Sequence, residues 1–353
     1  MTSPTTPTFQ QRTSAAISWL RFPLIFLVIL LHAYSVVQLP GSHAAYFKTV
    51  YPFALWLGET GVPGFLFISG YLFFLSRKTY GEKLRSRCHS LLVPYLLWNG
   101  LLLVGYLAAY AAGHPQDING RSMADYGWLD YVRLFWDRGS FDDGNFVPLL
   151  CPYWYIRNLL LLSLVSPLIY ILVKRLGAVF FLLPVAVWWM LTPHNAFIPQ
   201  SILFFSLGAY FSIRSKVPLR VFSEWKKPLL ALFLLLALAD VLSHVLVPTP
   251  FNLQLHRLAL LFNLPALFLL ADWFSQRNLQ SALLTNAAFI VFSAHYPLMV
   301  VLRKVCASSL GDACDGVQIL LYVGCVVVAT LLSLLFYLVL PRWARNLLSG
   351  NRS

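Results

Sequence analysis

Charged side chains are scarce in this sequence. Asp, Glu, Lys and Arg together make up 11% of the 353 residues, whereas 59% of the residues are hydrophobic. A soluble globular chain carries about 25% charged residues and about 45–50% apolar ones. Apolar stretches of about twenty residues recur along most of the chain. The composition therefore excludes an ordinary soluble domain and predicts an all-α polytopic membrane protein.

The apolar runs also lack the alternation of polar and apolar residues that the strands of a membrane β-barrel show. We expect about ten transmembrane helices in one membrane domain, residues 16–340, flanked by cytosolic tails at residues 1–15 and 341–353. The predicted spans are residues 16–38, 50–75, 91–112, 153–173, 178–193, 199–213, 228–247, 257–274, 284–304 and 317–340. The fifth and sixth spans are short, which also suits tilted, re-entrant or differently merged helices.

Acidic residues are half as numerous as basic ones, 13 against 26, and the formal net charge is +13. In a membrane protein this excess indicates topology and not nucleic-acid binding, because Lys and Arg gather in cytoplasmic loops. With the N-terminus inside, 17 of the 26 basic residues fall on the inner side and seven on the outer side. The outer loop 113–152 also holds six aspartates. The distribution predicts that both termini are cytosolic.

Cysteine and the common catalytic motifs are likewise sparse. The five cysteines form no CxxC pair and no metal-like spacing, so we expect no metal site. Cys306 and Cys314 fall in one predicted outer loop, where a disulfide is an open alternative. The chain has no G-x-S-x-G, HExxH, P-loop or Gly-rich dinucleotide motif, which removes the enzyme classes that those motifs define.

Two ionisable side chains interrupt the first apolar run. Arg21 and His32 are eleven residues apart, which in a helix is a rise of about 16 Å and a rotation of about 20°. Both side chains would therefore project from one face at two depths. Charged groups inside a span are costly and usually face a cavity or a partner. The pair indicates a passage that is lined by residues of this first span.

Other polar side chains fall at similar depth. Glu59 lies in the outer half of the second span, Trp154 and Arg157 open the fourth, and His295 is near the middle of the ninth. A histidine can act as a general base, a carboxylate can orient it, and an arginine can bind an oxyanion or a phosphate. We interpret His32, Glu59 and Arg157 as one site. The structural alternatives are a satisfied histidine, a snorkelling arginine and a carboxylate with its own partner.

The inner loop between the second and third spans is rich in cations. Its basic residues are Arg77, Lys78, Lys83, Arg85 and Arg87. Positive charge beside a membrane serves topology or anionic-lipid contact. A second interpretation is a cytosolic site for a phosphate-bearing donor such as coenzyme A.

At these residues the sequence resembles acyltransferase family 3 of integral membrane proteins, in its stand-alone bacterial form. The matching features run along nearly the whole chain. They are Arg21 and His32, the stretch GVPGFLFISGY that ends at Tyr71, the basic run RSRCHSLLVPYLLW, the segment WYIRNL at Trp154, and a late SAHYPL.

The resemblance implies transfer of an acyl group, most often acetyl, from cytosolic acyl-CoA to a hydroxyl of a sugar or lipid-linked glycan. It implies a multi-pass protein of the bacterial cytoplasmic membrane, with acyl-CoA, a glycan and membrane lipid as partners and no nucleic acid. The family's essential histidine maps to His32 and its span-1 arginine to Arg21. The family's Arg-x-x-Arg element is here Lys83-Leu-Arg85-Ser-Arg87, in which Arg85 and Arg87 point to different faces of a helix.

The hypothesis for the mechanism combines both sources. Acetyl-CoA would bind near Arg85 and Arg87, with Lys83 and Arg21 nearby, and His32 oriented by Glu59 would deprotonate the acceptor or carry the acyl group itself. Arg157 or Tyr71 would hold the oxyanion or the sugar, Trp154 would stack on the sugar, and His295 is also expected to bind the substrate. The rival interpretation is a transporter or flippase for a glycan intermediate, which suits the same polar passage.

Overall fold

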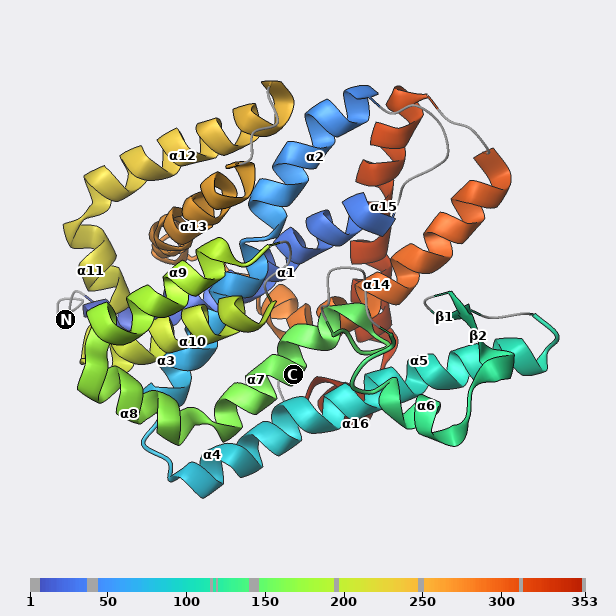
Figure 1. The fold of residues 1–353 in the computed structure, drawn as a ribbon, viewed down its shortest axis with the longest axis horizontal. Coiled ribbons are helices and arrows are strands. Elements are labelled where there is room, and N and C mark those ends of the chain that lie inside the picture. The colour runs from blue at the N-terminus through green and yellow to red at the C-terminus, as the bar shows by residue number, and fades with distance from the viewer. Residues whose placement is uncertain are drawn as a thin grey trace, which may run out of the picture.

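The computed structural model describes residues 7–36, 44–114, 117–118, 120–139, 146–193, 197–246, 251–310 and 314–350. Helices account for nearly all of the regular structure in these ranges (Figure 1). One short antiparallel pair, β1 (Asp117–Ile118) with β2 (Arg121–Ser122), lies in the predicted outer loop. The structure confirms the all-α fold that the composition predicts.

The helices differ in length and several meet end to end. The α-helices are α1 (Phe9–Val36), α2 (Ala44–Gly58), α3 (Gly61–Leu75), α4 (Tyr80–Arg87), α5 (Val93–Ala111), α6 (Trp128–Arg133), α7 (Trp154–Leu164), α8 (Ser166–Gly177), α9 (Leu183–Leu191), α10 (Phe197–Ile213), α11 (Pro218–Glu224), α12 (Lys226–Leu246), α13 (Asn252–Ser275), α14 (Ala282–Leu310), α15 (Asp315–Val339) and α16 (Arg342–Ser349). Two π-helical turns, η1 (Cys88–Leu92) and η4 (Ala178–Leu182), and two 3-10 turns, η2 (Met123–Asp125) and η3 (Cys151–Tyr153), join some of them.

Within the described residues, eight helical stretches are long and apolar enough to cross a membrane. The predicted fourth and fifth spans correspond to one such stretch, Ser166–Leu191, because α7 has only 11 residues and ends at Leu164. Gly177, with φ 68°, ends α8 inside that stretch, at the place where the sequence predicts a boundary. The predicted sixth span is α10, which has 17 residues and is shorter than the eight. The number of crossings and their orientation stay predictions.

Contacts between helix ends join segments that the predicted topology places on the same side. Arg12 at the start of α1 donates from Nε to Asp272 near the end of α13, at 3.0 Å. Arg214 after α10 donates to the carbonyl oxygen of Lys174 in α8, at 3.1 Å. Arg12, Lys174 and Arg214 are predicted to lie on the inner side, and Asp272 lies near the inner end of the predicted eighth span. The packing therefore agrees with the grouping of loops on which the topology rests.

The predicted C-terminal tail is a helix and not an extended segment. Helix α16 lies on α5, where the indole of Trp98 donates to the carbonyl oxygen of Leu348 at 3.1 Å. A Cβ at Gly350 would lie 2.6 Å from Cα of Ser90. The chain end is therefore packed against the segment that follows the basic loop.

Helix α3 approaches its neighbours at backbone distance. A Cβ at Gly70 would lie 2.0 Å from the carbonyl oxygen of Phe205 in α10, and one at Gly208 would lie 2.0 Å from that of Phe67 in α3. A Cβ at either of two glycines near the start of α3, Gly61 and Gly64, would lie 2.7 Å from an atom of Leu24 in α1. Small residues at close helix contacts are typical of membrane bundles. The glycines of the GVPGFLFISGY stretch thus have a packing role.

This close contact leads to a stability prediction. Gly208→Ala forces α10 away from α3 and should lower the free energy of unfolding by about 1–3 kcal/mol. Thermal unfolding of the detergent-solubilised protein measures the loss. Gly105→Ala in α5 is the control, because a Cβ there meets nothing within 4 Å and alanine is the better helix former. Equal thermal stability of the two variants would contradict the close contact.

Candidate active site

The structure places His32 of α1 against two side chains of α14. The ring centroids of His32 and His295 are 5.5 Å apart in a stacked arrangement. The ring of Tyr296 meets His32 edge-on, with centroids 5.3 Å apart. Two histidines predicted from opposite ends of the sequence therefore meet inside the helical bundle. Ionisable rings grouped at such a place indicate a functional site.

His295 is the more buried of the two histidines, with 0% of its surface exposed. Its Nδ1 lies 3.2 Å from the carbonyl oxygen of Val291, to which it donates, so Nε2 carries the lone pair. Among the described residues, that Nε2 has no hydrogen-bond partner. Buried polar atoms are nearly always paired, and an exception calls for an explanation. A lone pair facing the interior beside His32 is suited to accept a proton or a hydrogen bond from a substrate.

Tyr296 connects this histidine pair to the predicted outer loop. Its hydroxyl lies beside the side chain of Arg138, in the segment after α6, and beside the thiol of Cys151 in η3. Sequence analysis did not assign Arg138 or Tyr296 to the site. Tyr296 lies within the SAHYPL motif, and Arg138 is one of three basic residues in a loop of six aspartates, so weak signals for both were present.

Arg157 is buried, but its role differs from the predicted one. It donates to the carbonyl oxygens of Trp136 at 2.6 Å and Phe146 at 3.0 Å, and its guanidinium lies over the Trp136 ring at 4.9 Å. These bonds hold the backbone on both sides of Arg138. The structure therefore makes Arg157 a positioning residue for the loop, not a group that is open to an oxyanion or a sugar.

Polar side chains of α5 hold the same loop. The hydroxyl of Tyr95 donates to the carbonyl oxygen of Phe135. The Oδ1 of Asn99, which is fully buried, accepts from the backbone N–H of Leu150 at 2.9 Å. Buried peptide groups need such partners. The described parts of residues 134–150 are thus fastened to α5 and α7.

Two residues that sequence analysis assigned to substrate binding, Trp154 and Tyr71, are engaged by other side chains of the protein. The ring of Trp154 is stacked on Phe197 with centroids 3.9 Å apart, so one of its faces is occupied by the protein itself. The hydroxyl of Tyr71 donates to Gln10 at the start of α1, at 3.2 Å. Gln10 and His32 are separated by about 33 Å of helix rise. The structure does not bring Tyr71 to the histidine pair.

Glu59 has a different histidine from the one that sequence analysis assigned to it. Its Oε2 lies 3.1 Å from Nε2 of His256 in α13, and Nδ1 of His256 lies 2.8 Å from Oδ2 of Asp240 in α12. His256 is 3% exposed and Asp240 is 1% exposed. Both ring nitrogens of His256 are therefore engaged by carboxylates. The predicted orientation of His32 by Glu59 is wrong in this structure, because the carboxylate is paired with His256.

The basic loop folds into α4 and divides its cations between two faces. The Nζ of Lys83 lies 5.1 Å and the guanidinium carbon of Arg87 lies 5.7 Å from the ring centroid of Phe73. Residues four apart share a helix face, and Arg85 is exposed on another. Sequence analysis paired Arg85 with Arg87, whereas the structure pairs Lys83 with Arg87. Arg21 is exposed on α1.

The cysteines are all free thiols, so the alternative disulfide between Cys306 and Cys314 is not formed. In the parts of the chain that the structure describes, no three His, Cys, Asp or Glu side chains are arranged to hold a metal ion. The chemistry of the described site rests on histidine, tyrosine and arginine side chains.

Comparisons with known proteins identify the family of the chain. The model of the family described as acyltransferase domain matches residues 14–338. The Succinoglycan biosynthesis protein ExoH of Rhizobium meliloti (strain 1021) is 27% identical to the chain over 266 residues, which is 70% of this chain and 68% of that protein. No solved structure matches the chain.

The paired carboxylates around His256 lead to a prediction about stability. Asp240→Asn removes a buried charge from the group and leaves His256 with Glu59 alone, which should cost about 3 kcal/mol of unfolding free energy. Thermal unfolding in detergent measures it. The control is Glu224→Gln, which breaks the exposed Arg220–Glu224 pair and should change stability by less than about 1 kcal/mol. An unchanged unfolding temperature for Asp240→Asn would show that the pairing does not stabilise the fold.

Proposed function

Because the chain belongs to the membrane family described as acyltransferase domain, we propose that it moves an acyl group from cytosolic acyl-CoA to a sugar hydroxyl of a cell-surface glycan. The chain is a multi-pass membrane O-acyltransferase. We propose four further points: the acyl-CoA donor, the glycan acceptor, a location in the bacterial cytoplasmic membrane and the role of His32. The name of the Rhizobium relative, which refers to the biosynthesis of a glycan, supports the choice of acceptor.

The observation that carries the proposal is the stack of His32 on His295, whose Nε2 is buried without a described partner. In the proposed step, His32 takes the proton of the acceptor hydroxyl while the oxygen attacks the thioester carbonyl. The carbon–sulfur bond then breaks, and the thiolate of coenzyme A leaves and takes up the proton. The unpartnered lone pair of His295 accepts a hydrogen bond from the acceptor or from His32.

A covalent relay uses the same residues in two steps. A ring nitrogen of His32 attacks the thioester and releases coenzyme A, and the acceptor hydroxyl then attacks the acyl-histidine. Both routes need a donor for the negative oxygen of the tetrahedral intermediate. The hydroxyl of Tyr296, beside Arg138, is a better candidate for this donor than Arg157 or Tyr71, because the ring of Tyr296 lies edge-on to that of His32.

The donor would bind at the other end of α1. Lys83 and Arg87 flank Phe73 on one face of α4, which suits two cations that meet the phosphates of acyl-CoA. Arg21 lies about 16 Å of helix rise from His32, on the same face of α1. The proposed path for the acyl arm therefore runs along α1 from this basic face towards the histidine pair.

The first test concerns the histidines. His32→Ala should lower transfer of radiolabelled acetyl from acetyl-CoA at least about 100-fold, the size of a general base's contribution, with little change in unfolding temperature. His295→Gln should lower it less. His114→Ala, outside the pair, is the control and should leave transfer unchanged. Near-normal transfer by His32→Ala together with full loss in His295→Gln would assign the base to His295.

The second test concerns the donor site. The double variant Lys83→Ala, Arg87→Ala should weaken the binding of acetyl-CoA to protein in nanodiscs about tenfold or more, since each charged contact to a phosphate is worth over about 1.5 kcal/mol. Arg85→Ala is the matched control and should have a smaller effect, because Arg85 points away from Phe73. Equal affinities of the two variants for acetyl-CoA would show that Lys83 and Arg87 do not form the donor site. An absence of binding to any acyl-CoA would favour the transporter interpretation.

A further inference from the structure

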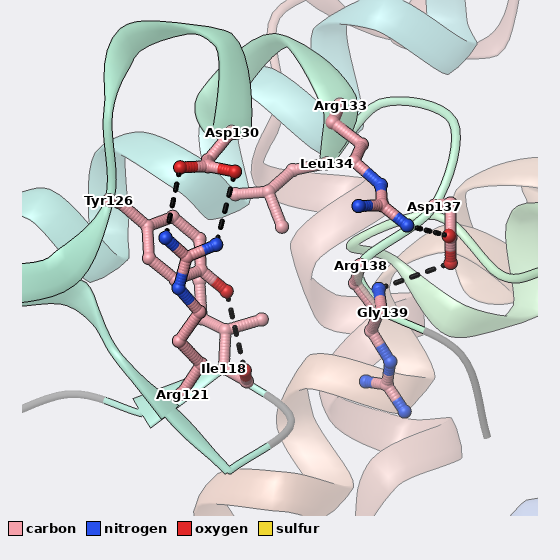
Figure 2. A pocket seen from close by; sticks show the side chains of 9 residues that line it. All are labelled: Ile118, Arg121, Tyr126, Asp130, Arg133, Leu134, Asp137, Arg138 and Gly139. Carbon is pink, nitrogen blue, oxygen red and sulfur yellow. Dashed lines mark hydrogen bonds and ion pairs between the residues drawn. The ribbon is translucent and has the colours of Figure 1, made fainter. Parts of the chain in front are cut away.

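The predicted outer loop, with β1, β2 and α6, lies beside the end of α5 (Figure 1). A pocket of about 250 Å³ opens in this loop (Figure 2). Of its lining residues, the proposed mechanism uses Arg138 alone. It is lined by Ile118, Arg121, Tyr126, Asp130, Arg133, Leu134, Asp137, Arg138 and Gly139. Its size is below the about 300–1,000 Å³ of sites for drug-sized ligands, so it suits a single small unit.

The walls of the pocket are mainly ionic. Arg121 meets both oxygens of Asp130, at 3.0 and 3.1 Å, and Nη2 of Arg133 meets Asp137 at 2.9 Å. A hydrogen bond from the N–H of Gly127, together with Arg121, lowers the pKa of Asp130, so that pair is charged at neutral pH. Two arginines thus face two aspartates, and the third arginine of the lining, Arg138, points away from them.

The arginines at the rim are open to solvent. The side chain of Arg121 is 49% exposed and that of Arg133 is 61% exposed. Figure 2 shows both guanidinium groups beside their aspartates at the mouth of the pocket. A guanidinium carries five N–H donors in a fork that matches a carboxylate. Donors and acceptors therefore alternate around the opening, and each exposed guanidinium has more N–H donors than its aspartate uses.

The pocket is connected to the histidine pair through one arginine. Asp137 is buried and accepts the N–H of Gly139 at 3.1 Å, in a turn where Gly139 has φ 120°. The N–H of Arg138 bonds to the carbonyl oxygen of Val147 at 2.8 Å. This turn directs the side chain of Arg138 away from the aspartates (Figure 2). The side chain of Arg138 ends beside the hydroxyl of Tyr296, whose ring meets that of His32.

We infer that this pocket binds one acidic sugar unit of the acceptor, held by its carboxylate at the rim arginines and by its hydroxyls at the two aspartates. The inference rests on the proposed function and adds the class of acceptor to it. The neighbouring unit of the glycan would then reach His32 past Arg138. A lipid headgroup fits less well, because the only aliphatic side chains in the lining are Ile118 and Leu134.

The experiment compares two disaccharides, cellobiouronic acid and cellobiose, which differ in one carboxylate. Binding to the full-length protein in neutral-lipid nanodiscs is measured by saturation-transfer NMR. We expect cellobiouronic acid to bind about fivefold more tightly, the worth of one exposed charge contact. Arg133→Gln should abolish that difference. Arg220→Gln, which removes an arginine from a comparable exposed pair, should preserve it.

Several results would overturn the inference. They are equal affinities for the two sugars, no effect of Arg133→Gln, or loss of sugar binding when the nanodiscs contain phosphatidylglycerol, which would assign the pocket to a lipid headgroup. Arg121→Lys, which keeps the charge and loses the fork, serves as the second variant if Arg133→Gln does not fold. Acetyl-CoA binding is measured on the same samples. If the protein binds acetyl-CoA but neither sugar, the inference about the pocket is wrong and the proposed function stands. If it binds the acidic sugar but neither binds acetyl-CoA nor transfers an acyl group, the proposed function is wrong and the pocket stands.

Discussion

The contact between Arg157 and the outer loop supports both the histidine site and the pocket. Arg157 is buried in α7 and gives its donors to the carbonyl oxygens of Trp136 and Phe146. Between those two residues the loop carries Arg138, which reaches Tyr296 beside His32. A buried cation is costly unless its donors are used, so the same bonds that satisfy Arg157 also fix the position of the loop. A buried arginine of α7 thereby organises the loop that precedes its helix.

Helix α1 packs against both α13 and α14, and an ionisable group lies on each side. Towards α13, His256 has both ring nitrogens engaged, by Glu59 and Asp240. Towards α14, His295 uses Nδ1 for a backbone carbonyl and keeps Nε2 without a described partner. A ring with both nitrogens bonded is held in place, whereas an unsatisfied ring nitrogen is available to a substrate. This difference separates His256 from His295, which we propose as the partner of His32 in the chemistry.

The proposed reaction uses the length of α1. The cations of α4 and Arg21 lie towards one end, and His32, Tyr296 and Arg138 lie towards the other. The thioester and the acceptor can then approach from opposite sides of the membrane and meet at a histidine that is screened from water. The close packing of α3 on glycines keeps α1 and α10 in place around this path. Positioning of this kind, and not a strong nucleophile, would supply much of the rate.

Composition and charge by themselves determined the membrane class and the all-α fold, and they predicted His32 and His295 as site residues, because apolar runs and intramembrane charges follow from the cost of burying polar groups. They did not determine partners. Glu59 was assigned to His32 because the two residues are predicted at similar depth, but the packing of the helices places its carboxylate beside His256. Depth along a helix can be read from residue number, but the face that meets a neighbour depends on how all the helices pack. Arg138 came to the site for the same reason, since only the tertiary structure folds an outer loop back onto α14.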